Sequence, residues 1–168
     1  MNLTWCNRAL TVAAALLPLV CVSLLSACAA KPPKPVKTPA QIIVSSDVNP
    51  DAAGRASPIV VRVFQLRNDG EFSAADFFPL YEKEKEILGA SLLSREEYVL
   101  APGETRTLDL SINTDARFIG VIAAYRDIRS AHWRALTRSP EKKLTDLIGK
   151  HGVTLSVGKD AVTLAVKD

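Results

Sequence analysis

Cysteine, histidine and clustered glycine are all scarce in this 168-residue chain. Two of its three cysteines, Cys6 and Cys21, lie in an apolar N-terminal leader, which leaves Cys28 alone after processing. We therefore expect no disulfide and no Cys/His metal site in the mature chain. The eight glycines are dispersed, which excludes a glycine-rich phosphate-binding loop. Nothing in this composition indicates a metal or an organic cofactor.

The chain also lacks a large excess of charge of one sign. There are 21 Lys and Arg residues against 18 Asp and Glu, and the leader contains only one of these charges. A balance so close to neutral excludes the dense basic surface of a nucleic-acid-binding protein. Apolar residues make up 48% of the chain, enough for a folded core, and the length fits one domain. We expect a globular domain without a nucleic-acid partner.

Groups suited to catalysis are few. The only histidines are His132 and His151, and no Gly-x-Ser-x-Gly nucleophile motif accompanies them. Glu96 and Glu97 are adjacent on a predicted strand, so their side chains point to opposite faces and cannot act as a glycosidase pair. We predict a protein that is not an enzyme and has no small-molecule substrate. An envelope hydrolase that depends on one histidine is the least favoured alternative.

What the sequence does contain is a secretory leader. Residues 9–25 are almost entirely apolar, but they are shorter than the roughly 20 residues of a membrane-spanning helix. Leu25-Ser26-Ala27-Cys28 resembles the lipobox of bacterial lipoproteins, against a plain signal peptide or a membrane anchor as alternatives. We predict a lipoprotein signal peptide over residues 1–27, followed by diacylglycerol and palmitate on Cys28. These acyl chains would make outer-membrane lipid a partner of the protein.

A segment rich in proline and lysine follows the cysteine. Bacterial lipoproteins that stay in the inner membrane commonly have Asp directly after the acylated cysteine, so Ala29 indicates the outer membrane, with the domain facing the periplasm. Residues 29–40 contain four prolines and three lysines, which favours a stiff polyproline II spacer. We predict an acylated cysteine and tether over residues 28–40 and a folded domain over residues 41–168.

Apolar and polar residues alternate through most of the folded domain, as in β-strands with one buried face. Seven or eight short strands without an internal repeat predict an antiparallel β-sandwich. Residues 138–150 are polar and predict a loop with a helical turn at 144–148. The predicted strands run from Ile42 to about Asp47, then Pro58–Leu66, Glu97–Leu100, Thr107–Ile112, Phe118–Tyr125, His132–Thr137, and a hairpin of 153–157 with 162–166.

Residues 73–88 interrupt the strand pattern. Ser73 and Asp76 have the spacing of a capping box. Pro79 is incompatible with the middle of a continuous helix but suits the first position of one. Apolar residues then recur seven positions apart, which predicts an amphipathic helix over Pro79–Leu88 that covers the sandwich, with Gly89 at its C-terminal cap.

Two surface features could bind a partner. The loop over residues 48–57 is long for a hairpin connection, which usually has about two to five residues. Its residues are typical turn formers, so an ordinary solvent-exposed loop explains them at least as well. Arg126, Arg129 and Arg134 lie near aromatic residues, as in interface hot spots, although an ion-paired surface explains this cluster equally well.

A series of stretches along the chain, in fixed order, is similar to one known family. They are the lipobox, Asn49-Pro50 through Gly54-Arg55, Pro58–Leu66, Ala75–Tyr81, Leu88-Gly89, Ala101–Glu104, Ile119–Arg126 and Trp133-Arg134. Together they resemble the TssJ family, the outer-membrane lipoproteins of the type VI secretion system. The resemblance implies a transthyretin-like β-sandwich with an inserted helical excursion.

The resemblance also implies partners. TssJ-family proteins are expected to bind the periplasmic C-terminal region of TssM, an IcmF-like inner-membrane protein, and to join TssL through it in a trans-envelope complex. A lipoprotein that inhibits or chaperones another envelope protein is the alternative. The family's TssM-contacting loop joins the first two strands, and it maps here onto Asn49, Pro50, Asp51, Ala52, Ala53, Gly54, Arg55, Ala56 and Ser57.

Overall fold

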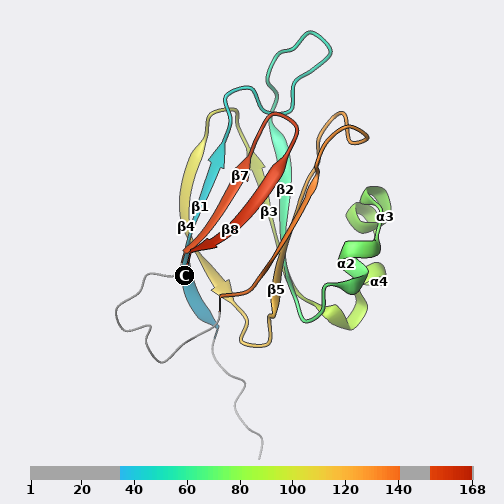
Figure 1. Cartoon of the computed structure of the whole chain (residues 1–168), viewed down its shortest axis with the longest axis vertical. Helices are drawn as coiled ribbons and strands as arrows, with labels where there is room; N and C mark the ends of the chain where they lie inside the picture. The colour runs from blue at the N-terminus through green and yellow to red at the C-terminus, as the bar shows by residue number, and fades with distance from the viewer. Residues whose placement is uncertain (1–34, 141–151, 168) are drawn as a thin grey trace, which may run out of the picture. The chain divides into compact units, whose positions relative to one another are not determined.

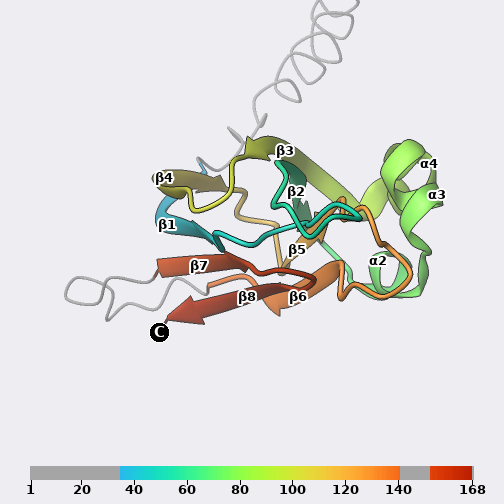
Figure 2. The same cartoon turned by 90° about the horizontal axis from the view of Figure 1, so that it is seen from above.

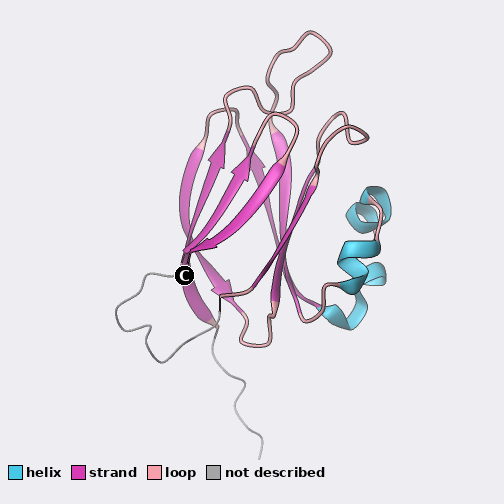
Figure 3. Cartoon of the chain, in the orientation of Figure 1, coloured by secondary structure: helices cyan, strands magenta, loops and turns pink. Residues whose placement is uncertain are grey.

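The computed structural model describes residues 35–140 and 152–167. Within these residues, eight strands form two four-stranded sheets (Figures 1 and 3). Sheet A has the order β4-β1-β7-β8, and sheet B has the order β3-β2-β5-β6. The strands are β1 Val36–Val44, β2 Ile59–Leu66, β3 Leu92–Leu100, β4 Thr105–Ile112, β5 Phe118–Ala123, β6 Arg134–Arg138, β7 Gly152–Val157 and β8 Val162–Lys167.

The two sheets pack face to face, and helices cover the other face of sheet B (Figure 2). Alternate residues of each strand enter the core between the sheets, for example Ile42, Val61 and Leu155, which are at most 3% exposed. The predicted β-sandwich with an inserted helical excursion is therefore confirmed. Its likeness to transthyretin stays a prediction.

One strand pair departs from the antiparallel prediction. β1 and β7 pair in parallel, from Ala40 opposite Val153 to Val44 opposite Val157. Antiparallel pairing is natural for neighbours joined by a short turn, whereas more than 100 residues separate these two strands. β1 thus lies inside sheet A, between the antiparallel β4 and the parallel β7.

The predicted boundary between tether and domain is wrong by five residues. β1 begins at Val36, so residues 36–40 lie in sheet A rather than in a polyproline spacer. Thr38 is buried while Lys37 and Pro39 are exposed, which continues the alternation of the strand. Pro39 is tolerated because residues 36–39 pair with β4 alone, so its missing N–H need not serve a second neighbour.

Other strand bounds differ from the expected ones at polar residues. β3 begins at Leu92 rather than Glu97, because its charged residues lie on an edge strand with solvent beside it. β5 ends at Ala123 instead of Tyr125, and β6 spans Arg134–Arg138 instead of His132–Thr137. The helical turn predicted at 144–148 lies outside the described residues.

The helical excursion consists of short pieces rather than one amphipathic helix. Its helices are α2 Gly70–Ala74, α3 Phe77–Glu82 and α4 Glu84–Leu88, followed by a 3-10 turn, η2, over Gly89–Ser91.

The prediction of a helix over Pro79–Leu88 was therefore wrong. Pro79 is the third residue of α3, where the backbone N–H has no intrahelical partner in any case. The helix ends at Lys83, which separates α3 from α4. Ser73 and Asp76 form no capping box, since Ser73 lies inside α2 and Asp76 makes no side-chain cap bond. Gly89 does end α4, with φ at 47°.

These helices build a second core on the outer face of sheet B. Phe64, Phe72 and Leu80 are fully buried there, with no exposed surface. A Cβ atom at Gly120 would lie 2.7 Å from the Phe72 ring, so only glycine lets this ring reach β5. The second core explains why β5 is apolar on both faces. None of the helices in the described part of the chain is long and apolar enough to cross a membrane.

Candidate partner-binding surface

The predicted binding loop projects from one end of the sandwich. In Figure 1 it is the connection between β1 and β2 that extends beyond the strands at the top. The β3–β4, β5–β6 and β7–β8 connections lie at the same end. We call this the loop end, defined by residues 45–58, 101–104, 124–133 and 158–161. The opposite end, where β1 begins, is called the base end.

Asn49 anchors the loop to its neighbours. It is 4% exposed and has φ at 49°, a left-handed conformation that asparagine tolerates better than most residues. Its Nδ2 donates to the Pro58 carbonyl at 2.9 Å, and its Oδ1 accepts from the Arg126 N–H at 2.8 Å. Its own N–H donates to the Lys159 carbonyl at 3.0 Å. The side chain and backbone of Asn49 together therefore link three connections, β1–β2, β5–β6 and β7–β8.

This anchoring buries two residues of the predicted contact set, which itself stays a prediction. Asn49 and Ser57, at 4% and 8% exposure, belong to the stem of the loop and offer little side-chain surface to a partner. The exposed part is the tip, Ala52–Arg55. Sequence patterns give turn formers throughout the loop, so they cannot separate its stem from its tip.

Asp51 closes the tip into a fixed turn. Its Oδ1 accepts from the N–H groups of Ala53 and Arg55, both at 2.9 Å, and its Oδ2 accepts from the Arg55 Nε at 2.8 Å. These bonds, led by the one from the Arg55 backbone, hold the pKa of Asp51 below its usual value. Gly54 has φ at 77°, a left-handed conformation that favours glycine. The tip is thus ordered although it is exposed.

The chemistry of the tip suits binding rather than catalysis. It presents the small residues Ala52, Ala53 and Gly54 beside Arg55. The guanidinium of Arg55 pairs with Asp51, although the Arg55 side chain is 80% exposed. In residues 35–140 and 152–167, no group of three or more His, Cys, Asp or Glu side chains could hold a metal ion. The surface can offer shape, backbone groups and one guanidinium.

Sequence reasoning missed how the β5–β6 connection joins this surface. Its exposed residues include Arg126 and Arg129, and the Arg126 N–H bonds to Asn49 in the loop stem. The Tyr125 hydroxyl donates to the Gly158 carbonyl at 3.1 Å, and burial raises the pKa of this tyrosine. Only the pairing of distant strands brings these segments together, so no local signal in the sequence could have shown it.

The structure does not bring together the three arginines that were expected to cluster, Arg126, Arg129 and Arg134. Arg134 lies on β6 opposite Ile122, on the face of sheet B that the helices cover. Its guanidinium donates to the carbonyls of Phe72 and Ala75 at 2.8 and 2.9 Å, where it holds α2 on the sheet. Arg126 and Arg129 remain at the loop end without it.

The candidate catalytic groups that the structure describes are His132, Glu96 and Glu97. His132 is exposed, and its backbone bonds to Asp160 and Val162 link β8 to the β5–β6 connection. His151 lies outside the described residues. Glu96 accepts from the Tyr98 hydroxyl, whereas Glu97 pairs with Arg62 on the outer face, so the two carboxylates point apart as predicted.

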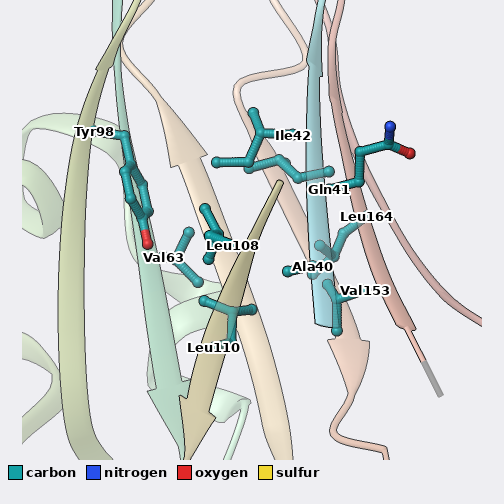
Figure 4. A pocket seen from close by; sticks show the side chains of 10 residues that line it. Ala40, Gln41, Ile42, Val63, Tyr98, Leu108, Leu110, Val153 and Leu164 are labelled. Carbon is teal, nitrogen blue, oxygen red and sulfur yellow. The ribbon is translucent and has the colours of Figure 1, made fainter. Parts of the chain in front are cut away.

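Two hollows elsewhere in the described residues have linings that do not suggest a catalytic or ligand-binding site. A small cavity between the sheets is apolar, and Figure 4 shows Val63, Leu108 and Leu110 converging on it while Gln41 points away. An open surface hollow lies beside the break between α3 and α4. Its main charges are already paired, with Arg62 at 3.0 Å from Glu84 and 2.7 Å from Glu97, and Arg95 at 3.1 Å from Glu84.

Comparison with known proteins agrees with this arrangement of a sandwich, a helical cover and an ordered loop. The family described as type VI secretion lipoprotein, VasD, EvfM, TssJ, matches residues 37–167. The chain belongs to the TssJ family. Proteins of this family are structural lipoproteins of type VI secretion and not enzymes, which removes the hydrolase alternative.

Solved structures show the same fold. TssJ1 from Pseudomonas aeruginosa, a T6SS lipoprotein, is 28% identical with a TM-score of 0.72, over 80% of this chain and 98% of that one. Lip from Serratia marcescens, a membrane-bound component of the type VI secretion system, is 31% identical with a TM-score of 0.69, over 77% and 96%.

A third match is a chain of a structure described as the T6SS protein TssM C-terminal domain (869–1107) from EAEC. It is 25% identical with a TM-score of 0.61, over 76% of this chain and 99% of that one. Among curated protein sequences, none matches the chain.

Proposed function

We propose that this TssJ-family chain is an outer-membrane lipoprotein of the type VI secretion membrane complex and binds the periplasmic C-terminal region of TssM. In this proposal acyl chains on Cys28 hold the domain at the outer membrane, facing the periplasm. TssM reaches it from the inner membrane, and TssL joins the complex through TssM. The chain then acts as an anchor and has no catalytic role.

The observation that carries the TssM-binding proposal is the ordered, exposed tip of the β1–β2 loop. Asp51 holds residues 52–55 in one conformation, and Asn49 fixes the stem, so binding needs little further ordering of the backbone. A surface that is ordered before binding loses less conformational entropy on association. Small tip residues also allow close approach of a partner's surface.

The neighbouring connection extends this surface. Arg126 and Arg129 are exposed beside the loop, and Arg55 adds a third guanidinium. Arginine is enriched at the centres of protein interfaces because it forms several hydrogen bonds and also packs on apolar groups. Such a surface suits a partner that presents carboxylates or backbone carbonyls.

The relatives support the proposed setting. Serratia Lip is membrane-bound within the type VI system. The third match covers 99% of its chain with 76% of ours, about 128 residues, whereas the TssM range 869–1107 spans 239 residues. This difference in length favours a matched chain that is a partner of that TssM domain, and it supports TssM as the partner here.

Calorimetry with the TssM periplasmic domain from the same genome tests the proposed interface. Deletion of Asp51–Arg55 should weaken binding at least tenfold, because it removes the tip while the Asn49 contacts remain. Arg55→Glu should weaken binding less. Thr163→Glu places the same side chain on the exposed outer face of sheet A and serves as the control. Unchanged affinity after the deletion, or an equal loss in the control, removes the loop from the interface.

Acylation is tested separately. Labelled palmitate should enter the wild-type chain in cells and be absent from Cys28→Ser, while the soluble variant keeps its fold. Label in the Cys28→Ser chain would overturn the assignment of the lipid to this residue.

A further inference from the structure

The free edge of sheet A lies along β4, which is the outermost strand of this sheet and pairs with β1 alone (Figures 1 and 2). The Val44 N–H donates to the Glu104 carbonyl at 2.9 Å, which shows that the even-numbered residues of β4 bond to β1. Successive residues of a strand point their N–H and C=O groups to opposite sides, so Thr105, Thr107 and Asp109 direct theirs to the free edge. Among the residues that the structure describes, none bonds to these backbone groups.

The half of this edge nearer the base end is already occupied. Gln65 reaches it from β2 in the other sheet and is only 4% exposed. Its Nε2 donates to the Ser111 carbonyl at 3.0 Å, and its Oε1 accepts from the Asn113 N–H at 2.7 Å. One side chain thus takes up the backbone groups that a further strand would need there. The open part of the edge, residues 105–109, begins directly after the loop end.

The other edge strands are closed or charged. β6 and β8 face each other across the opposite side of the sandwich, where an isolated bridge pairs His132 with Ala161. β3 carries Arg95, Glu96 and Glu97 in succession. Charged side chains commonly protect edge strands against pairing with another chain. The open part of β4 is therefore the edge to compare with them.

This open part has little protection of the same kind. It contains no proline, and its pairing with β1 continues without a bulge. Its outward charge is Asp109. Arg106 faces the inter-sheet side, where its Nη2 lies 2.6 Å from Glu104 Oε1 and its guanidinium 5.8 Å from the centre of the Tyr98 ring, so a partner strand would meet a charge that is already neutralised. Leu108 is half-buried and lines the apolar cavity between the sheets (Figure 4).

We infer that the partner bound at the loop end adds an extended segment to β4, as a fifth strand of sheet A. This inference rests on the proposed function, in which that partner is the periplasmic C-terminal region of TssM. Strand addition takes its affinity from main-chain hydrogen bonds and its specificity from side chains at alternate positions. The segment that fits has an apolar residue opposite Leu108, which it covers. It has no acidic residue opposite Asp109, because like charges on paired residues destabilise a sheet.

A second copy of the chain fits this edge less well. Two β4 strands related by a two-fold axis pair antiparallel, so their base ends would point in opposite directions. Lipid on both Cys28 residues would instead draw both base ends toward one leaflet. A segment of the partner has no such constraint, because it can run along β4 from the loop end in either direction.

Amide hydrogen exchange tests the strand addition without any substitution. The probe is the domain without leader and lipid, which folds alone, since 80% of this chain matches 98% of the crystallised Pseudomonas chain. The amides of Thr105, Thr107 and Asp109 should exchange at least tenfold more slowly in the complex with the TssM periplasmic domain than in the free domain. The amides of Arg106 and Leu108, which already bond to β1, are the internal control and should change less.

A proline on the open edge provides the matching binding measurement. Thr107→Pro removes an outward N–H without removing a bond to β1, so the domain should stay folded and its affinity for the TssM domain should fall at least tenfold in calorimetry. Thr107→Val keeps this N–H and the shape of the side chain, and it should bind as wild type does. Unfolding curves verify that both variants are folded. If Thr107→Pro does not fold, the exchange measurement decides alone.

The outcomes separate this inference from the proposed function. Absence of binding between the wild-type domain and TssM refutes both. Normal binding with unchanged exchange at residues 105–109 overturns the strand addition alone. An equal loss of affinity in Thr107→Val would place the contact in the side chain and contradict a backbone ladder. Exchange at these amides that slows as the concentration of the free domain rises would assign the edge to a second copy and also overturn the inference.

Discussion

The two sheets of this domain are exposed to water in different ways. Among residues 35–140 and 152–167 no helix packs on the outer face of sheet A, which we call the bare face, and side chains such as Lys37, Gln41 and Thr107 alternate there with buried residues. The outer face of sheet B lies under the helical excursion, so β5 is apolar on both faces. This difference shows that the main structural role of the helices is to bury a second hydrophobic core against sheet B. What remains available to a partner is the loop end, the base end, the bare face and the free edge of β4.

The largest expected effect concerns the cover of sheet B. Phe72→Ala should lower the free energy of unfolding by about 3–5 kcal/mol, because the buried ring fills the space above Gly120. Phe78→Ala is the matched control, since Phe78 is 59% exposed in the same excursion and its loss should cost little. Urea denaturation measures both. Similar losses for the two variants would mean that the helices do not form a second core.

The ion pairs on the outer face of sheet B should have the next largest effect. Arg62→Ala removes one of the two arginines that Glu84 and Glu97 share, the other being Arg95, and it removes a hydrogen bond to the Tyr81 carbonyl. We expect a loss of about 2–3 kcal/mol, because Arg62 and Glu84 are each only 13% exposed. Thr107→Ala on the bare face of sheet A should change stability by less than about 0.5 kcal/mol. If Arg62→Ala lowered the free energy of unfolding as little as Thr107→Ala, polar side chains on the two outer faces would contribute equally to stability.

Asn49 joins both sheets at the loop end, and its replacement tests that link. Asn49→Ala should cost about 2 kcal/mol, because the Pro58 carbonyl and the Arg126 N–H lose their partner. Asn49→Gly keeps the left-handed backbone and should cost less, so the two variants separate hydrogen bonding from conformation. Thermal unfolding provides the comparison. Wild-type stability in Asn49→Ala would show that other contacts hold the loop.

The smallest expected effect is the pH dependence of the tip. The folded pKa of Asp51 is lowered, so its contribution to stability is complete above the unfolded value of about 3.9 and is lost as pH falls through the folded pKa. Asp51→Asn should therefore differ from wild type at pH 7, and the difference should shrink toward pH 2. Unfolding midpoints across this range measure it. A constant difference would show that the carboxylate charge does not hold the tip.

Much of the fold follows from local patterns in the sequence. Period-two alternation located most strands, and the turn formers of residues 48–57 located the loop. The contact between Gly120 and Phe72, which is 48 residues away in sequence, came only from the structure. Local patterns succeed here because one buried face imposes a regular repeat on each strand.

The failures have one physical origin, which is contact between distant segments. Residues 36–40 look like a spacer because of their composition, yet pairing with β4 makes them a strand. Arg134 is near Arg126 in the chain but faces α2, because the register of β6 against β5 sets its side. Asn49 looks like an exposed turn residue until Arg126 and Lys159 are placed against it.

The direct run of β1 from the tether to the loop has a mechanical consequence. In the proposed complex, tension between the outer membrane and TssM enters at Val36 and leaves beyond Val44, along the axis of a single strand. This strand is hydrogen-bonded to β4 on one side and to β7 on the other, so the pull loads two ladders of bonds in shear at once. Bonds loaded together share a force that would open a hairpin one bond at a time. The order of strands in sheet A thus suits a domain that must transmit load without unfolding.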